Sequence, residues 1–394
     1  MVPAGISNEK WSVVACDQFS SERDYWERVR NYIGGAPSTL DMIIPEAYLG
    51  EINEEKKISE ISAVMDERLH RGQLREIENS FIYVERSQSN GLVRCGLIGA
   101  IDLERYDFSG NDAEICASEN TVLDRLPARI RVRRAARLEL PHIIAFIDDK
   151  DNTVIGPLSE KAERLPLLYD FDLMEGGGHI MGARVYDAVA DDVLTAIRAL
   201  HEKGGPLMVV GDGNHSLAAA KVYWDDIKRG LSEAGREDHP ARRALLEVNN
   251  VYDPAVSFEA IHRVVFGADP AEFSRAFIRA MPHGDDYELR LVSRGHNSAV
   301  RVSADCIGDM LTMVQAFLDE RAEGTGCRID YIHGTDTAER LAQGDNCLGI
   351  ILPAMDKAEL FGTVAKRGVF PKKSFSVGRA RDKRYYLECR VIKS

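Results

Sequence analysis

Apolar side chains recur at helical spacing in several segments of the chain. Residues 58–74 predict an amphipathic helix, because their apolar residues recur at steps of three and four positions and therefore share one face. These residues are Ile58, Ile61, Val64, Met65 and Leu69. Residues 187–201 show the same pattern, and Gly204 marks the end of that helix. Residues 22–32 and 307–319 also predict helices.

Short apolar runs bounded by turn residues predict strands between these helices. Residues 81–86 and 93–102 predict a hairpin, because Asn90 and Gly91 between them are typical of a tight turn. The other expected strands span residues 141–147, 207–210, 245–252, 259–266, 348–353 and 385–392. Helices and strands alternate irregularly, so we predict an α+β fold in which a mixed sheet packs with helices.

The length of the chain predicts two lobes. At 394 residues it exceeds the size of a typical single domain, so we expect each lobe to have its own core. The first would be an N-terminal α/β lobe of residues 1–150. The second would span residues 151–394 and end in a basic tail. Three consecutive glycines at residues 176–178 predict a flexible hairpin tip near this boundary.

The charge of the chain argues against nucleic acid as a partner. The formal net charge is −13, which repels a phosphate backbone on average. Six arginines between residues 125 and 137 form a local basic cluster. Because this cluster lacks interleaved aromatic residues, we expect it to form salt bridges or a solvated surface.

Other compositional features indicate a cytoplasmic protein. The apolar runs are too short to span a membrane, and the N-terminus lacks the basic and apolar regions of a signal peptide. Seven dispersed cysteines without a C-x-x-C pair are typical of reduced thiols. Ten histidines without metal-ligand spacing predict no structural metal. The oligomeric state is not indicated.

The segment from residue 207 to residue 224 has the pattern of an anion-binding turn. A short apolar strand leads into Gly-Asp-Gly-Asn-His-Ser, and a strong helix-forming run follows. The free backbone N–H groups and the positive dipole end of such a helix face whatever lies in the turn. Gly211 and Gly213 permit a positive φ and the close approach of a ligand to the backbone.

The polar residues of this turn have both functional and structural interpretations. Asp212 could orient a metal ion or accept a proton, and His215 could act as a general acid. Ser216 and Asn214 could bind a phosphate oxygen, or either could only cap the helix. His215 could equally be an ordinary surface residue. The turn matches neither a Walker A loop nor Gly-x-Gly-x-x-Gly.

Residues 211–221, which read G-D-G-N-H-S-L-A-A-A-K, resemble an element of the bacterial family known as domain of unknown function 1015. That element reads D-G-H-H-R/N-H-S and joins a strand to a helix. Further segments resemble other parts of the family, so the resemblance extends over nearly the whole chain. These segments are residues 14–19, residues 118–121 with Asp124 and Arg125, residues 261–263, and Leu352 and Pro353 with residues 366–371.

The same element is similar to the phosphate-binding motif of ParB-like and sulfiredoxin-like proteins. This wider group includes free-serine kinases and CTP-binding chromosome-partition proteins. The resemblance implies a ParB/sulfiredoxin-like strand–loop–helix element that binds phosphate. Ser216 stands where the motif has an arginine. Arg263, Arg125 or Lys221 would then supply the missing positive charge.

Several residues outside the turn are also candidates for the site. With the resemblance, Glu119 is a candidate general base, and Arg125 is a candidate phosphate ligand. His262 and Arg263, at the end of an expected strand, could stabilise a transferred phosphoryl group. The structural alternatives are surface ion pairs and a solvent-facing strand end. Asp17 follows an apolar strand and could point into a cleft or cap the next helix.

Three functions remain open from the sequence. The first is a phosphotransferase or phosphohydrolase that acts on a small phosphorylated metabolite, with serine or phosphoserine implied by the resemblance to the serine kinases. Its cofactor would be ATP or ADP with Mg²⁺. The alternatives are a nucleotide-gated ParB-like regulator and a non-catalytic sensor of an anionic ligand. The regulator would need a basic helix-turn-helix, which the sequence does not show.

Overall fold

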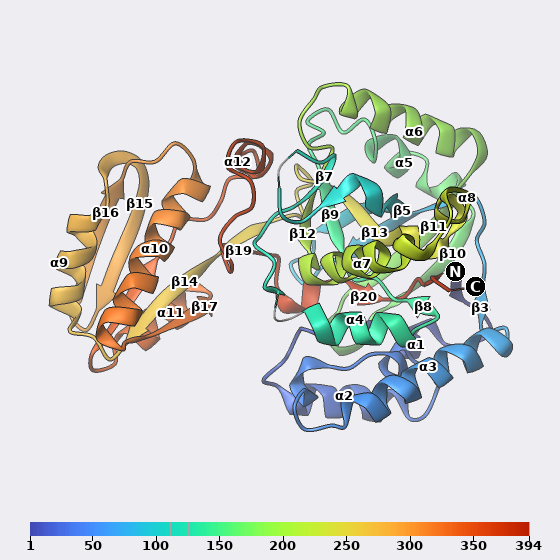
Figure 1. Ribbon diagram of the computed structural model, residues 1–394, viewed down its shortest axis with the longest axis horizontal. Helices are drawn as coiled ribbons and strands as arrows, with labels where there is room; N and C mark the ends of the chain where they lie inside the picture. Colours follow the sequence, from blue (N-terminus) through green and yellow to red (C-terminus); the bar gives the residue numbers. More distant parts are fainter. Residues whose placement is uncertain (111, 124–125, 394) are drawn as a thin grey trace.

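Two β-sheets organise the chain in the computed structural model, which describes residues 1–110, 112–123 and 126–393 (Figure 1). Among these residues, nine strands form the large sheet, in the order β10-β11-β4-β5-β13-β9-β12-β7-β6. The strands are β4 (Phe81–Ser87), β5 (Val93–Asp102), β6 (Tyr106–Asp107), β7 (Ile115–Ala117), β9 (Ile144–Ile147), β10 (Leu167–Asp172), β11 (His179–Val185), β12 (Met208–Asp212) and β13 (Arg243–Asn250). The sheet is mixed, because β13 runs parallel to β9 whereas β12 runs antiparallel to it.

The large sheet carries a hydrophobic core on each face, because successive side chains of a strand point to opposite sides. On β4, Tyr83 joins one core, whereas Ile82 and Val84 join the other. The Tyr83 face is covered by α6 (Asp187–His201) and α7 (Asn214–Ile227). The opposite face is covered by α2 (Arg23–Ile33), α3 (Glu54–His70) and the C-terminal segment. Further helices of this lobe are α1 (Asn8–Trp11), α4 (Leu126–Ala135), α5 (Gly156–Ser159) and α8 (Glu233–Asp238).

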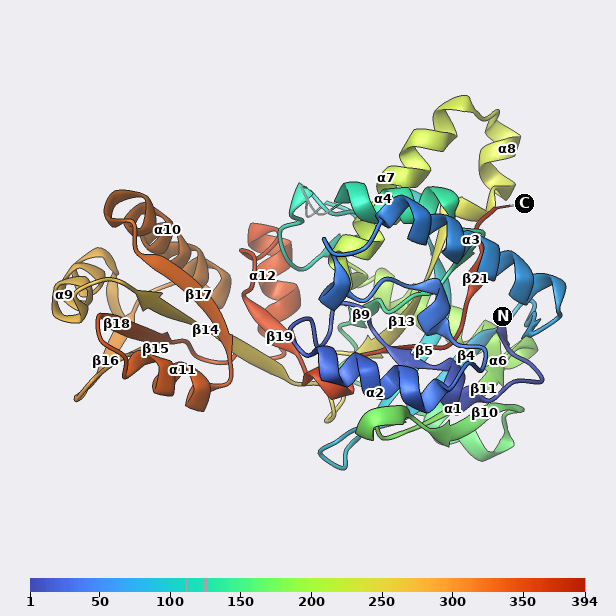
Figure 2. The same cartoon turned by 90° about the horizontal axis from the view of Figure 1, so that it is seen from below.

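The second sheet is smaller and antiparallel, and it lies to one side of the large sheet (Figures 1 and 2). In the described part of the chain its strands are β14 (Phe258–Phe266), β15 (His283–Ser293), β16 (His296–Val302), β17 (Arg328–His333), β18 (Cys347–Ile351) and β19 (Phe375–Val377). Helices α9 (Pro270–Ala280) and α10 (Ile307–Thr325) pack on one face. Helix α11 (Thr335–Ala342) packs on the other. Helix α12 (Glu359–Arg367) lies toward the large lobe (Figure 2).

The strands of the two sheets do not follow a division of the chain at residue 150. The large sheet takes strands from both sides of that position, from β4 to β13. The small sheet is formed entirely between β14 and β19. Strand pairing does not define domains, so the two domains of residues 1–150 and 151–394 stay a prediction. Strand pairing alone indicates a small lobe that interrupts a large one, and we use "large lobe" and "small lobe" for these two parts.

The C-terminal segment returns from the small lobe to the large lobe and ends beside the N-terminus (Figure 1). Strand β20 (Tyr385–Tyr386) pairs with β2 (Val13–Val14), and β21 (Arg390–Val391) pairs with β8 (Leu138–Glu139). The amino group of Met1 donates a hydrogen bond of 2.8 Å to the Cys389 carbonyl. Near the N-terminus, β1 (Val2–Pro3) pairs with β3 (Leu74–Arg75). Both chain ends are therefore held in the same region of the large lobe.

A buried ion cluster fastens this returning segment to the large sheet. Glu247 of β13 accepts hydrogen bonds from Arg94 of β5, at 3.3 Å, and from Arg384. Arg384 also pairs with Glu388. All four side chains are at most 4% exposed. Burial alone would raise the pKa of Glu247, but Arg94 and Arg384 hold it at about 2, so this carboxylate stays charged.

Most of the expected elements form. The helices expected in residues 22–32, 58–74, 187–201 and 307–319 correspond to α2, α3, α6 and α10, and the mixed sheet is confirmed. The single strand expected in residues 385–392 forms instead as two short strands, β20 and β21, which pair with two different partners, β2 and β8. The arginines of α4 form salt bridges, as with Arg129 and Glu46 at 2.6 Å. No helix in the described ranges has both the length and the apolar character that a membrane crossing requires.

The glycines at residues 177 and 178 join β10 to β11 and are held by close packing. Gly178 has a φ of +81°, and a Cβ there would lie 2.0 Å from the Ser87 carbonyl oxygen. Gly91, in the β4–β5 turn, has a similar φ of +83° but no atom within 4 Å of such a Cβ. The predicted hairpin forms at this position, but its flexibility stays a prediction, because a Cβ on Gly177 would also lie 2.4 Å from the Tyr385 hydroxyl.

We predict that Gly178→Ala lowers the free energy of unfolding by more than Gly91→Ala does. Both variants carry the cost of a positive φ, roughly 1–2 kcal/mol, and only Gly178→Ala adds a backbone clash. Urea denaturation followed by circular dichroism measures both values. Equal losses would show that the contact with Ser87 relaxes without cost.

We also predict that Glu247→Gln destabilises the protein by about 3 kcal/mol at pH 7, because it leaves Arg94 and Arg384 without their buried partner. The pKa of Glu247 is lowered from 4.5 to about 2, so the stability that it provides is present above pH 4.5 and is lost as the pH falls toward 2. The difference between wild type and variant should therefore shrink as the pH falls from 4.5 to about 2. The control is Glu114→Gln, which breaks a more exposed pair with Arg105 and should cost less than about 1 kcal/mol. A Glu247→Gln protein as stable as the control would contradict the assignment.

Candidate functional site

The candidate site is centred on the turn between β12 and α7. Gly213 has a φ of +80° and forms the N-cap of α7, and no side chain caps this helix within the described structure. A Cβ on Gly213 would lie 2.9 Å from Ile143 Cγ1, and one on Gly211 would lie 2.1 Å from Phe146 Cε2. Packing against β9 and its preceding loop therefore explains both glycines without a ligand. The uncapped start of α7 is the feature that an anion could use.

A buried ion pair lies directly at this turn. Asp212 Oδ1 accepts a hydrogen bond of 3.0 Å from the Gly213 N–H, and its Oδ2 lies 3.2 Å from Lys383 Nζ. The side chain of Lys383 is only 8% exposed, and that of Asp212 is 17% exposed. Lys383 comes from the C-terminal segment, immediately before Arg384 of the buried ion cluster. The ion cluster thus determines where this ammonium group lies.

A second carboxylate, Asp17, belongs to the same group of charges. Burial raises the pKa of Asp17, but His142, the Gln18 amide at 3.1 Å and Lys383 together hold it below its ordinary value. Asp17 therefore remains ionised near neutral pH. Lys383 pairs with Asp212 and acts electrostatically on Asp17, which lies on a different segment of the large lobe. The alternative in which Asp17 only caps a helix does not occur, because Glu22 is the N-cap of α2.

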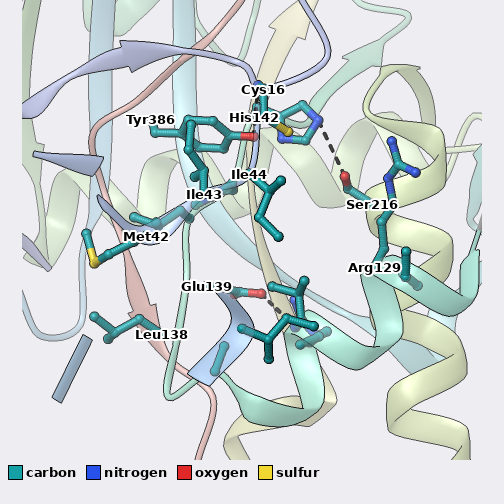
Figure 3. Close-up of a pocket in the computed structure, with 18 of the residues that line it drawn as sticks. Cys16, Met42, Ile43, Ile44, Arg129, Leu138, Glu139, His142, Ser216 and Tyr386 are labelled. Carbon is teal, nitrogen blue, oxygen red and sulfur yellow. Dashed lines mark hydrogen bonds and ion pairs between the residues drawn. The ribbon is translucent and has the colours of Figure 1, made fainter. Parts of the chain in front are cut away.

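Ser216 and His142 form the polar edge of a cavity beside the turn (Figure 3). The hydroxyl oxygen of Ser216 lies 3.4 Å from His142 Nε2. His142 is 7% exposed and packs edge to face against Tyr386, with ring centroids 5.4 Å apart. The hydroxyl expected to bind a phosphate therefore lies against an imidazole and opens toward the cavity.

Asn214 and His215 connect the start of α7 to the loop after β7. The amide oxygen of Asn214 accepts a hydrogen bond of 3.2 Å from the Ser118 N–H, and its amide nitrogen donates to the Ser118 hydroxyl. His215 Nε2 accepts a hydrogen bond of 3.2 Å from the Val122 N–H. In this arrangement both side chains position the turn. Their expected roles in phosphate binding and acid catalysis stay predictions.

Glu119 fastens the loop between α12 and β19. Its carboxylate accepts hydrogen bonds from the N–H groups of Lys373, Ser374 and Phe375, at 3.4, 3.0 and 3.4 Å. Burial raises the pKa of Glu119 although these three donors and Lys373 act in the opposite direction. A raised pKa is suited to a general base, but the three donors occupy the carboxylate. The catalytic role of Glu119 stays a prediction.

His262 and Arg263 lie on β14 within the small lobe and are fully engaged there. His262 bonds to the Thr335 hydroxyl at 3.0 Å and accepts the Leu352 N–H at 3.2 Å, and burial lowers its pKa to about 4. Arg263 is 1% exposed, donates to the Ile261 carbonyl at 2.5 Å and lies over the Tyr331 ring. Burial lowers its pKa to about 10. Arg263 also acts electrostatically on Glu119, and the expected roles of His262 and Arg263 at the phosphate site stay predictions.

Of the three cations that could supply the missing charge, Lys221 and Arg263 lie within the described residues, and each has partners of its own. Lys221 pairs with Asp225 at 3.1 Å along α7, and Arg263 lies in the small lobe. Asp124 and Arg125 lie outside the described residues. The cation at the turn is Lys383, which sequence reasoning counted only as part of a basic tail. Neither Lys383 nor His142 has a local signal in the sequence, because tertiary packing alone brings each to the turn.

A metal ion has limited support in the geometry. The described part of the chain contains no group of three or more His, Cys, Asp or Glu side chains that could hold one. A Mg²⁺ ion that accompanies a nucleotide needs only one or two carboxylates from the protein. Asp17 and Asp212 provide that chemistry near the start of α7.

Comparison with solved structures finds distant likenesses. A free serine kinase in complex with AMP has 12% sequence identity, covers 75% of this chain and 91% of its own, and superposes with a TM-score of 0.38. A C-terminally truncated SbnI from Staphylococcus aureus has 9% identity, coverages of 71% and 82%, and a TM-score of 0.39. A conserved hypothetical protein from Pyrococcus furiosus has 11% identity, coverages of 74% and 94%, and a TM-score of 0.38.

Sequence comparison identifies the family. No curated protein matches the chain. A family model with the description "Protein of unknown function (DUF1015)" matches residues 4–320, which include the β12–α7 turn and both Asp17 and Glu119. The resemblance carried by residues 211–221 is therefore confirmed, and the chain belongs to the DUF1015 family.

Proposed function

We propose that this protein binds the phosphate group of a small metabolite or nucleotide at the β12–α7 turn and acts on it as a phosphotransferase or phosphohydrolase. The observation that carries the proposal is the Lys383–Asp212 pair at the uncapped start of α7. This pair puts a buried ammonium group and a carboxylate beside the positive end of a 14-residue helix.

The phosphate group would lie against the α7 N-terminus and Lys383. Backbone N–H groups and the helix dipole favour an anion there, and a lysine ammonium strengthens the attraction as a point charge. The nearby carboxylates would repel the phosphate if they were not balanced. Lys383 balances part of this charge, and a Mg²⁺ ion bound with a nucleotide would balance the rest. ATP or ADP with Mg²⁺ is therefore compatible with this group of residues.

Asp212 is the group best placed to accept a proton from a substrate hydroxyl. It pairs with Lys383, and it lies at the end of β12 next to the turn. Asn214, His215 and Glu119 act in this proposal as positioning residues, because their hydrogen bonds hold the turn and the loop between α12 and β19. The similarity of the turn's sequence to the motif of free-serine kinases makes serine and phosphoserine the first substrates to test.

The proposed regulator function receives no such support. The α4 arginines that a nucleic acid could use are paired with acidic side chains, as in Arg131–Glu54 at 2.8 Å and Arg134–Asp226 at 2.6 Å. A non-catalytic sensor would use the same turn and the same Lys383. It differs from the enzyme only in the absence of turnover.

We predict that Lys383→Met weakens the binding of phosphate-containing ligands by roughly 10- to 100-fold, which corresponds to the loss of one charge-assisted hydrogen bond. Isothermal titration calorimetry with inorganic phosphate, ATP, ADP, CTP and phosphoserine, with and without Mg²⁺, measures this change. The matched control is Lys221→Met, which removes a lysine paired with Asp225 on α7 and should leave the affinities unchanged. Unchanged binding by a folded Lys383→Met protein would refute the phosphate site.

We further predict that Asp212→Asn reduces turnover by roughly 10²- to 10⁴-fold, the usual contribution of a general base, while it leaves ligand affinity within a few-fold of wild type. The assay follows phosphoryl transfer between nucleotides and serine, and the release of phosphate from phosphoserine. Wild-type turnover that persists in Asp212→Asn would remove Asp212 as the base. Tight binding without any turnover in the wild type would favour the sensor.

A further inference from the structure

The large lobe contains an apolar cavity next to the proposed phosphate site. The cavity has a volume of about 210 Å³ and lies between α3, α4 and the segment that precedes β9 (Figure 3). Aliphatic and thioether side chains form most of its wall, among them Met42, Ile43, Ile58, Met65, Val132 and Leu138. Engineered apolar cavities of about 150 Å³ bind benzene, so a cavity of this size can hold one ring or a branched aliphatic chain.

One end of the cavity reaches the start of α7. Ser216 and Ala219 both line it, and they lie one turn apart on the same face of that helix. His142, which contacts the Ser216 hydroxyl, lines the same end. His142 also acts electrostatically on Asp17, and Lys383 acts on the same carboxylate. The apolar space is therefore continuous with the group of charges at the turn.

The charged side chains around the cavity are already paired with one another. Arg133 bonds to Glu139 at 2.7 Å, and Arg129 bonds to Glu46 at 2.6 Å. Burial raises the pKa of the Cys16 thiol to about 12, so this group is uncharged and is not a thiolate nucleophile. The cavity thus provides a favourable environment for an uncharged group. It provides no favourable environment for a second ion.

The other end of the cavity leads to solvent. Leu49 lines it and is 44% exposed, which makes it one of the few large apolar side chains at the surface of the described chain. Glu54, at the start of α3, also lines the cavity. An exposed apolar side chain at the rim is suited to the entry of an apolar group.

We propose that this cavity binds the organic part of the substrate, and that the substrate is a small phosphate compound whose organic part is a single ring or a branched aliphatic group. The assignment rests on the proposed phosphate site at the β12–α7 turn. It disfavours phosphoserine, whose short polar backbone would leave the aliphatic wall without a partner. The phosphate lies at α7 and Lys383, and the apolar group extends past Ser216 and His142 between α3 and α4.

The test compares phenyl phosphate, phosphoserine, inorganic phosphate and uncharged benzyl alcohol by isothermal titration calorimetry. The full chain is used as wild type, as Val132→Phe, which fills the cavity, and as Ile130→Phe. Ile130 lies on the same helix but packs toward Leu126 and Ala218, so its variant is the matched control. Circular dichroism melts of each variant verify folding.

We expect the wild type to bind phenyl phosphate at least tenfold more tightly than phosphoserine or inorganic phosphate, because the ring is removed from water. Val132→Phe should abolish this preference and leave the affinity for inorganic phosphate unchanged, whereas Ile130→Phe should keep both. Equal wild-type affinities for all three phosphates would overturn the cavity assignment and leave the phosphate site intact. A preference for phenyl phosphate that survives in Val132→Phe would also overturn the cavity assignment.

The uncharged ligand separates this inference from the proposed function. If benzyl alcohol binds to the wild type and not to Val132→Phe, while no phosphate compound binds, the cavity is confirmed as an apolar ligand site and the phosphate function fails. If neither benzyl alcohol nor any phosphate compound binds, both proposals fail.

Discussion

The placement of the C-terminal segment depends on a carboxylate buried beneath the large sheet. Glu247 can remain ionised in the interior only because Arg94 and Arg384 surround it, since an unpaired buried charge carries a large desolvation cost. Arg94 belongs to the sheet and Arg384 belongs to the returning segment, so the ion cluster joins two distant parts of the chain. Apolar residues in place of this ion cluster could stabilise the fold equally well. They would not specify the position of the C-terminal segment in the same way.

The position of that segment determines the chemistry of the turn. Lys383 precedes Arg384 directly, so the backbone that the ion cluster holds also brings an ammonium group to Asp212. Tyr385 and Tyr386 follow, and their pairing with β2 holds the N-terminal strand that leads to Cys16 and Asp17. One buried cluster thus organises both carboxylates and the cation that acts on them.

The glycines of the turn show why a motif alone does not establish a ligand site. A side chain at Gly211 would meet the Phe146 ring, and one at Gly213 would meet Ile143, so both residues are needed for packing. What distinguishes this turn from an ordinary strand–helix connection is the combination of an uncapped helix, a buried lysine and two carboxylates, with an apolar cavity at its side. The hydrogen bonds and ring contact of His262 and Arg263 that hold them in place lie within the small lobe.

Local patterns in the sequence determined the helices α3, α6 and α7, the β4–β5 hairpin and the strand–turn–helix element at Asp212, because each depends on periodicity or turn residues within a short window. The residues that resemble the DUF1015 family were also recognisable in sequence. Tertiary structure alone decided that Lys383 supplies the charge at the turn, that Arg263 is buried beside Tyr331, and that His142 meets Ser216. These contacts join residues far apart in the chain, and the free energy that selects them comes from burying whole faces of a sheet and pairing buried charges. No local window of sequence contains that information.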